Sequence, residues 1–208
     1  QAHELGIAFI LLAGGEPLLR PDVLSAAGSM HSIVFPIFTN GTMVDEAFAN
    51  VVANHRNLVP IVSLEGDRIA TDRRRGDGTY DTVMQALALL HQRKLFFGLS
   101  ITVSKTNLAA ITSAPFIQSL VEHGCRIFMF IEYVPVDGIS QELAIDEAER
   151  AELAHFEAWA RHTWRDRIFI SFPGDEQKMG GCLAAGRGFF HLNTDGSAES
   201  CPFSPYGD

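Results

Sequence analysis

The stretch AFILLAGGEP, from Ala8 to Pro17, decides how the rest of the sequence is interpreted. Its first five residues, Ala8–Leu12, form an unbroken apolar run, which is typical of a strand covered on both faces of a sheet. Two glycines and a proline follow, and glycine lets a backbone approach a ligand closely. We therefore predict a buried strand whose carboxyl end carries a functional loop.

The same pattern recurs along the chain, because short apolar runs alternate with segments of helical periodicity. This alternation predicts parallel strands joined by crossover helices. The predicted strands after Ala8–Leu12 are Ile33–Phe38, Pro60–Leu64, Phe97–Val103, Ile127–Val134 and Ile168–Phe172. The predicted helices are Pro21–Met30, Val44–Asn54, Tyr80–Arg93, Ala109–His123 and Ile145–His162. The fold class is α/β, and such units could form an open doubly wound sheet or a complete or partial barrel.

The alternation stops near Gly174, which we predict to be a domain boundary between residues 1–173 and 174–208. The turn Asn193-Thr194-Asp195-Gly196 lies between the short runs Phe189–Leu192 and Ala198–Cys201. Asp-Gly between two such runs predicts a β-hairpin.

Composition excludes several classes of protein. The formal net charge of −9 disfavours nucleic-acid binding, which needs clustered Lys and Arg. No apolar run reaches the roughly 18–20 residues of a membrane helix, and no signal peptide is recognisable, so we expect a cytoplasmic protein. Three cysteines are too few for a disulfide framework, and Cys125, inside an apolar segment, is expected to be buried.

Polar and glycine residues lie at the carboxyl ends of five successive predicted strands, and the fourth strand itself carries Ser100 and Thr102. They are Gly14-Gly15-Glu16-Pro17, Thr39-Asn40-Gly41, Ser63-Leu64-Glu65-Gly66-Asp67, Ser100 and Thr102 with Lys105-Thr106-Asn107, and Glu132-Tyr133-Val134-Pro135. Each alone could be a turn or a helix cap. Because ligands of parallel α/β folds bind at the carboxyl ends of strands, their recurrence predicts one shared ligand site.

This ordered set resembles the radical S-adenosylmethionine (SAM) superfamily, in particular its branch with a C-terminal SPASM or twitch extension. The resemblance covers essentially the whole chain and implies a partial (βα)6 barrel of the TIM type. It also implies SAM as cofactor, with Gly14, Gly15, Glu16 and Pro17 at the amino group of its methionine moiety. A basic residue, Arg75, would meet the SAM carboxylate, and Arg73 or Arg74 could serve instead.

The resemblance assigns the remaining strand ends to other parts of SAM. Ser63 and Glu65 match positions that face the methionine moiety or the ribose, and Asn40 belongs to the same set. Ser100 and Thr102 match the strand beside the ribose, whereas Tyr133 and Val134 match the strand end beside adenine. Hydroxyls for ribose, a guanidinium for a carboxylate and apolar walls for a flat base agree with the chemistry of SAM.

Cys182 and Cys201 carry the second part of the resemblance. Thirteen residues separate Cys182 from Gly196, and Gly196 is followed by four residues and Cys201, a spacing similar to that which opens SPASM and twitch extensions. The resemblance implies that these thiolates bind an auxiliary iron–sulfur cluster, which usually needs four cysteines. Two unrelated free thiols or a zinc site are the alternatives.

The sequence departs from the family because it contains no Cys-x3-Cys-x2-Cys, the set that holds the family's [4Fe-4S] cluster. We therefore expect a fragment that is inactive by itself. In the intact protein the resemblance implies reduction of SAM by an electron-donor protein, formation of a 5′-deoxyadenosyl radical, and hydrogen abstraction from a substrate, possibly a peptide or protein. One alternative is a noncatalytic barrel that binds a ligand or peptide. Another is a lyase or aldolase that uses Lys105.

Overall fold

The computed structural model describes residues 4–135, 140–184 and 186–201. Its centre is a parallel sheet whose five strands lie in chain order. These strands are β1 (Phe35–Thr39), β2 (Leu58–Leu64), β3 (Gly98–Val103), β4 (Ile127–Glu132) and β5 (Ile168–Phe172). Parallel strands in chain order require a crossover after each strand, so the predicted βα alternation is confirmed.

The predicted first strand, Ala8–Leu12, lies parallel to β1 along its outer edge. The Ile10 N–H donates to the Val34 carbonyl at 3.0 Å, and the Leu12 N–H donates to the Pro36 carbonyl at 2.8 Å. Only two isolated bridges form, and Phe9 and Leu11 are 62% and 53% exposed, so the prediction of a buried strand here is wrong. In the described residues this segment pairs only along the edge next to β1, and its other edge is left open. The barrel is therefore partial, as the sequence predicts.

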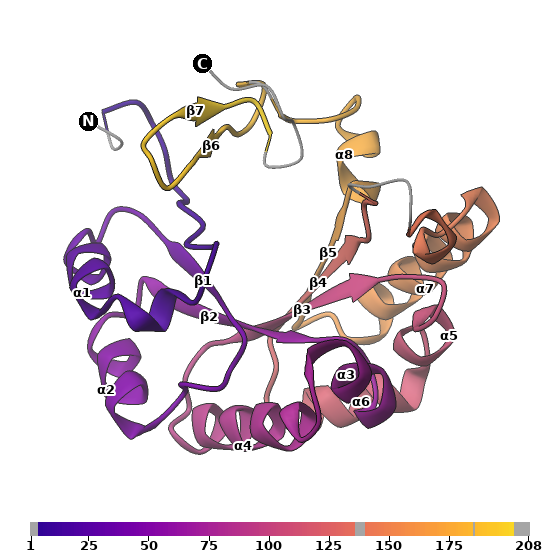
Figure 1. Cartoon of the computed structure of the whole chain (residues 1–208), viewed down its shortest axis with the longest axis horizontal. Coiled ribbons are helices and arrows are strands. Elements are labelled where there is room, and N and C mark those ends of the chain that lie inside the picture. Colours follow the sequence, from indigo (N-terminus) through magenta and orange to yellow (C-terminus); the bar gives the residue numbers. More distant parts are fainter. Residues whose placement is uncertain (1–3, 136–139, 185, 202–208) are drawn as a thin grey trace.

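Helices line the outer, convex side of the curved sheet (Figure 1). The helices of the described residues are η1 (Pro17–Leu19), α1 (Pro21–Ser29), α2 (Glu46–Asn54), α3 (Arg68–Arg75), α4 (Thr79–Gln92), α5 (Leu108–Ile111), α6 (Ala114–Glu122), η2 (Gln141–Leu143), α7 (Glu147–Thr163) and α8 (Gly174–Lys178). Of these, α8 lies past the end of β5 and not in the convex layer (Figure 1). Four of the five predicted helices match α1, α2, α4 and α7. Val83, Leu87 and Leu90 of α4 are fully buried against the sheet, as expected for one apolar helix face.

Three helices differ from the prediction. The single helix expected over Ala109–His123 is divided into α5 and α6, because Pro115 lies in the first turn of α6 and cannot continue the preceding helix. Residues of α3 and α8 were predicted to be turn and loop. In α8, Asp175 accepts a hydrogen bond from the Ser171 N–H at 2.9 Å and contacts Arg161, so tertiary contacts stabilise this short helix.

The sheet has one large core and one small one. The large core lies between the sheet and the helices, and its largest fully buried side chains include Phe97, Phe128 and Phe130. On the opposite, concave face Val59, Ile61 and Met129 form the small cluster. Since alternate residues of a strand share a face, Ser63 follows Ile61 on the concave face, closer to the carboxyl end.

The C-terminal hairpin is confirmed, although its strands are shorter than predicted. β6 (His191–Leu192) pairs antiparallel with β7 (Ala198–Glu199), and the Asn193 N–H donates to the Ser197 carbonyl at 2.9 Å. Figure 1 places the hairpin away from the main helices, across from the concave side of the sheet. Among the described residues, no helix combines the length and apolar character needed to cross a bilayer.

Candidate functional site

The Gly14–Pro17 loop is fixed to the next strand by one carboxylate. Glu16 Oε1 accepts hydrogen bonds from the Thr39 hydroxyl at 2.8 Å and the Leu18 N–H at 3.1 Å, and Glu16 Oε2 accepts from the Asn40 N–H at 2.9 Å. The Glu16 carboxylate therefore holds the loop against the carboxyl end of β1. Pro17 begins η1 directly after it.

The two glycines of this loop form an open turn. Gly14 has φ +79° and Gly15 has φ +40°, which are left-handed values that favour glycine. A Cβ at either position would meet no atom within 4 Å. The backbone at this strand end is thus held in place yet accessible to a ligand.

Hydroxyl groups gather on the concave face at the next two strand ends. Ser63 of β2 is in register with Ser100 of β3, and Thr102 lies two residues farther along β3, on the same face. Ser100 is buried, and the other two side chains are half-buried. Asn40 is less available, since its Oδ1 accepts from both the N–H and the hydroxyl of Thr42.

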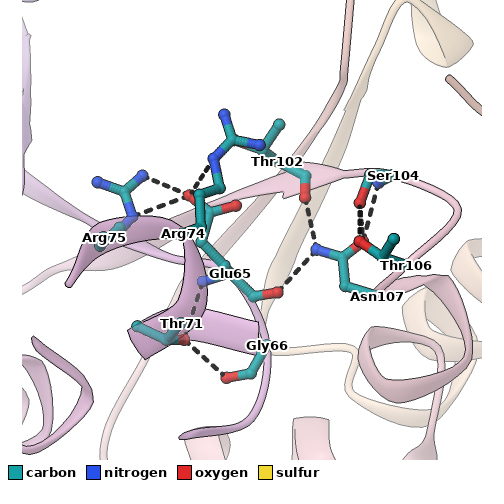
Figure 2. Close-up of polar contacts among 9 residues, drawn as sticks. All are labelled: Glu65, Gly66, Thr71, Arg74, Arg75, Thr102, Ser104, Thr106 and Asn107. Atoms are coloured by element: carbon teal, nitrogen blue, oxygen red, sulfur yellow. Dashed lines mark hydrogen bonds and ion pairs between the residues drawn. The ribbon is translucent and has the colours of Figure 1, made fainter. Parts of the chain in front are cut away.

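Glu65 is a buried carboxylate at the end of β2 (Figure 2). Its side chain is 2% exposed. Its Oε1 accepts from Arg75 Nε at 2.8 Å and from Arg75 Nη2 at 2.6 Å, and Arg74 Nε lies 3.5 Å away. In the described part of the chain, Glu65 Oε2 is buried and has no hydrogen-bond partner. Because such atoms are normally paired in proteins, Oε2 is suited to a donor from a ligand.

The three successive arginines 73–75 form the last turn of α3, a helix that the sequence analysis does not predict. Asp67 starts this helix, since its Oδ1 accepts from the Ala70 N–H at 2.9 Å. Cations are favourable at a helix C-terminus, and α3 thereby directs Arg75 to Glu65. Arg75 is half-buried at 24% exposure.

A cleft of about 490 Å³ opens beside Glu65. Arg74, Thr106 and Tyr133 contribute to its lining. The Arg74 guanidinium lies 5.7 Å from the centre of the Tyr133 ring, and the Tyr133 hydroxyl is 2.6 Å from the Ser140 hydroxyl. Val134, next in sequence, is 42% exposed. The cleft thus offers both an aromatic wall and cations.

The cysteines lie elsewhere. Cys125 is fully buried, as expected, and burial raises the pKa of its thiol to about 12. Cys182 is exposed and Cys201 is partly exposed, and both are free thiols. In residues 4–135, 140–184 and 186–201, no group of three or more His, Cys, Asp or Glu side chains is placed to hold a metal. Their assignment as cluster ligands stays a prediction.

Lys105 does not have the environment of a Schiff-base lysine. Its ammonium lies 3.3 Å from Asp146 and 3.5 Å from Glu149. The hydrogen bond to Asp146 is the main cause of a raised Lys105 pKa, whereas an amine nucleophile needs a lowered one. The geometry disfavours the lyase or aldolase alternative.

Sequence reasoning gave no role to three residues that build the site: Thr39 and Asn107, which it noted only as polar residues at strand ends, and Thr71, which it missed. Thr71 and Asn107 contact the backbone of Glu65, and Thr39 contacts Glu16. Asn107 belongs to the polar group noted after the fourth predicted strand, and its position just past a strand end was the available signal. Thr71 lies inside a run of charged residues that gave none.

Comparison with known proteins tests the resemblance to the radical SAM superfamily. No protein-family model matches the chain. It is 26% identical over 180 residues to the serine-type anaerobic sulfatase-maturating enzyme of Klebsiella aerogenes, covering 76% of this chain and 42% of that enzyme. It is 25% identical over 232 residues to the AdoMet-dependent heme synthase of Methanosarcina barkeri, covering 99% and 66%. These relatives are radical SAM enzymes, so the predicted resemblance of the chain to that superfamily is confirmed.

Solved structures show the same fold. SuiB of Streptococcus suis bound to its precursor peptide SuiA has a TM-score of 0.77 and 15% identity, covering 97% of this chain and 50% of SuiB. Native anSMEcpe with bound AdoMet and the Kp18Cys peptide has a TM-score of 0.70 and 17% identity, covering 95% and 61%. The chain therefore spans about two fifths to two thirds of the length of these relatives.

Proposed function

We propose that the chain forms the SAM-binding core of a radical SAM enzyme that modifies a peptide or protein. The observation that carries the proposal is the convergence of unsatisfied or accessible polar groups on one edge of the sheet. These groups are the open Gly14–Gly15 turn, the Ser63 and Ser100 hydroxyls, and the buried Glu65 Oε2. The turn carbonyls and Glu65 Oε2 can accept hydrogen bonds from the ammonium and hydroxyl groups of SAM. The serine hydroxyls can donate hydrogen bonds to its oxygen atoms.

Two strand ends would bind the methionine moiety. Backbone carbonyls of the Gly14–Gly15 turn accept hydrogen bonds from the SAM ammonium, and no side chain stands in their way. Arg75 supplies cationic donors to the SAM carboxylate, with Ser63 as a neighbouring hydroxyl donor. The two carboxylate oxygens of Glu16 already accept three hydrogen bonds. Glu16 would therefore act indirectly, by keeping the Gly14–Pro17 loop in the position that binds SAM.

The following two strands would bind the nucleoside. Ser100 and Thr102 donate hydrogen bonds to the ribose oxygens, and Glu65 Oε2 accepts one from a ribose hydroxyl. This hydrogen bond gives the buried Oε2 a partner, which avoids the cost of burying an unpaired acceptor. Tyr133 and Val134 form the wall against adenine, since an aromatic ring and a branched side chain suit a flat base. Asn40 would contribute through the turn that it forms with Thr42, because its amide oxygen already accepts two hydrogen bonds there.

The chain's own residues do not fit the [4Fe-4S] cluster of the family. When bound, such a cluster would supply the electron for the radical chemistry of the family. The sequence has three cysteines, none of them in a Cys-x3-Cys-x2-Cys set, and Cys125 is buried as a thiol. The role of these residues is to bind and orient SAM, with cluster ligands and an electron-donor protein supplied from elsewhere.

Two further parts of the proposal rest on the relatives. SuiB and anSMEcpe have been solved with peptides bound, which supports a peptide or protein substrate. Cys182 and Cys201 flank the hairpin and are proposed to be two ligands of an auxiliary iron–sulfur cluster in a domain that starts near Gly174. A cytoplasmic location agrees with this reductive chemistry.

The test is a calorimetric titration of the anaerobically purified chain with SAM. The wild-type chain should bind, and Ser100→Ala should weaken binding about tenfold, the size expected for a buried hydrogen bond. Ser171→Ala is the matched control, because Ser171 is a buried strand serine that contacts Glu157 on the helix side of the sheet. Absence of SAM binding, or equal effects of the two variants, would refute the proposed site and leave a noncatalytic barrel.

A further inference from the structure

Asn107 joins the carboxyl ends of β2 and β3 where their backbone pairing stops. The last paired residues are Leu64 and Ile101. One step beyond, Asn107 Nδ2 donates to the Glu65 carbonyl at 2.7 Å and to the Thr102 carbonyl at 2.7 Å (Figure 2). A single side-chain amide thus replaces the next rung of the sheet.

The orientation of this amide is fixed from its other end. Asn107 Oδ1 accepts from the Ser104 N–H at 2.8 Å and from the Ser104 hydroxyl at 3.2 Å. Asn107 is 4% exposed. A carboxamide has two N–H donors and two acceptor positions, and all four are used here. The spacing of the two strand ends is therefore set by a rigid, buried group.

Glu65 is held from three directions, and Asn107 provides one of them. The Glu65 N–H donates to the Thr71 hydroxyl at 3.3 Å, its carbonyl accepts from Asn107, and its Oε1 accepts from Arg75. The one remaining group is Oε2. Since Asn107 also holds Thr102, it determines where Glu65 Oε2 and Arg75 lie relative to the β3 hydroxyls.

We propose that Asn107 is a positioning residue for SAM, which sets the separation between Glu65 and its partner Arg75, next to the end of β2, and the β3 hydroxyls that bind the ribose. Asn107 need not touch SAM. The inference rests on the proposed function, because it assumes that Arg75 and the β3 hydroxyls bind parts of one cofactor. It goes beyond that function because it gives Asn107 an effect on SAM affinity, although Asn107 is not one of the residues proposed to contact SAM.

Asn57 provides a matched control. It is also buried, at 9% exposure, and its Nδ2 contacts the carbonyls of Ala27, Met30 and Ile33 at 3.0 to 3.2 Å. It lies just before β2, at the opposite end of the sheet from the proposed site. Loss of either amide removes its hydrogen bonds to two or three backbone carbonyls, so both variants should destabilise the fold, but only one should affect the site.

The experiment compares Asn107→Ala with Asn57→Ala in the full chain, using thermal unfolding and titration with two probes, SAM and 5′-methylthioadenosine. Asn107→Ala should weaken both ligands about tenfold, because alignment worth about one hydrogen bond is lost. Asn57→Ala should lower the melting temperature similarly and change neither affinity. Arg75→Met should weaken SAM alone, since 5′-methylthioadenosine lacks the carboxylate.

The outcomes separate the inference from the proposed function. If wild-type protein binds SAM and the two asparagine variants have equal affinities, the inference is overturned and the proposed function stands. If wild-type protein binds neither probe, both are overturned. Asn107→Ser, which keeps a hydroxyl but cannot span the two carbonyls, replaces Asn107→Ala if the alanine variant does not fold, and the same affinities decide.

Discussion

Arg75 should be worth more to stability than an exposed arginine, because it neutralises a carboxylate that water cannot reach. The Glu65 side chain is 2% exposed, and Arg75 makes its two short contacts at 2.8 and 2.6 Å. Removing one partner of a buried pair costs about 3 kcal/mol. In a domain of this size each kcal/mol lowers the melting temperature by about 2–4 °C, so Arg75→Met should melt about 6–12 °C lower.

Two further variants show whether the buried charge is the cause. Glu65→Gln combined with Arg75→Met removes the charge and its partner together and should lie within about 1 kcal/mol of wild type. Arg74→Met should cost less than about 1 kcal/mol, because Arg74 is 43% exposed and 3.5 Å from the carboxylate. Urea unfolding followed by circular dichroism measures all three. A double variant as unstable as Arg75→Met would refute the reasoning.

Burial of Glu157 raises the pKa of its carboxyl from 4.5 to about 6, so protonated Glu157 favours the folded state. That contribution is complete below pH 4.5 and is lost as pH rises through 6; Glu157→Gln should therefore stabilise the protein by about 2 kcal/mol at pH 7. At pH 4, Glu157→Gln should show no gain in the free energy of unfolding. The control Glu152→Gln, an exposed position on the same helix, should show no gain at either pH. A gain for Glu157→Gln that does not depend on pH would contradict this explanation. At Gly15 the left-handed backbone makes an alanine cost about 1 kcal/mol, but its Cβ meets no neighbouring atom. Gly15→Ala should therefore fold. It should also lose SAM affinity in a titration. Asp146→Ala removes the capping box of α7 and should cost about 1 kcal/mol in thermal unfolding, and an unchanged melting temperature would argue against that cap.

The strands and the main helices could be predicted from the sequence because their patterns are local. Continuous apolar runs such as Phe97–Val103 indicate strands covered on both faces, and β3 lies within that range. The positions of Ser63 and Ser100 at strand ends, and hence their proximity, follow from the parallel topology alone. The helical boundary near Pro115 was available from the sequence as well, since proline ends a preceding helix.

What could not be predicted depends on contacts distant in sequence. α3 has a strongly charged sequence without an apolar stripe, and it is stabilised by the Asp67 cap, the buried Thr71 and the Arg75 contact with Glu65. Likewise, a local reading treats Glu16 as a free ligand, whereas the structure shows its carboxylate bonded to Thr39 and Asn40, 23 and 24 residues away. Sequence patterns locate polar groups but do not tell which of them are already satisfied.

The hydrogen bonds of Glu16 and Asn107 have one consequence in common for motion. Each loop at the carboxyl edge is fastened to the neighbouring strand as well as to its own, by Glu16 between the first loop and β1 and by Asn107 between β2 and β3. Amide protons in these turns should therefore exchange with solvent as one cooperative unit instead of loop by loop. Because these loops are already fixed, a cofactor that binds at this edge of the sheet should cause little further ordering of the backbone. The entropy of binding should then come mainly from the water that is released.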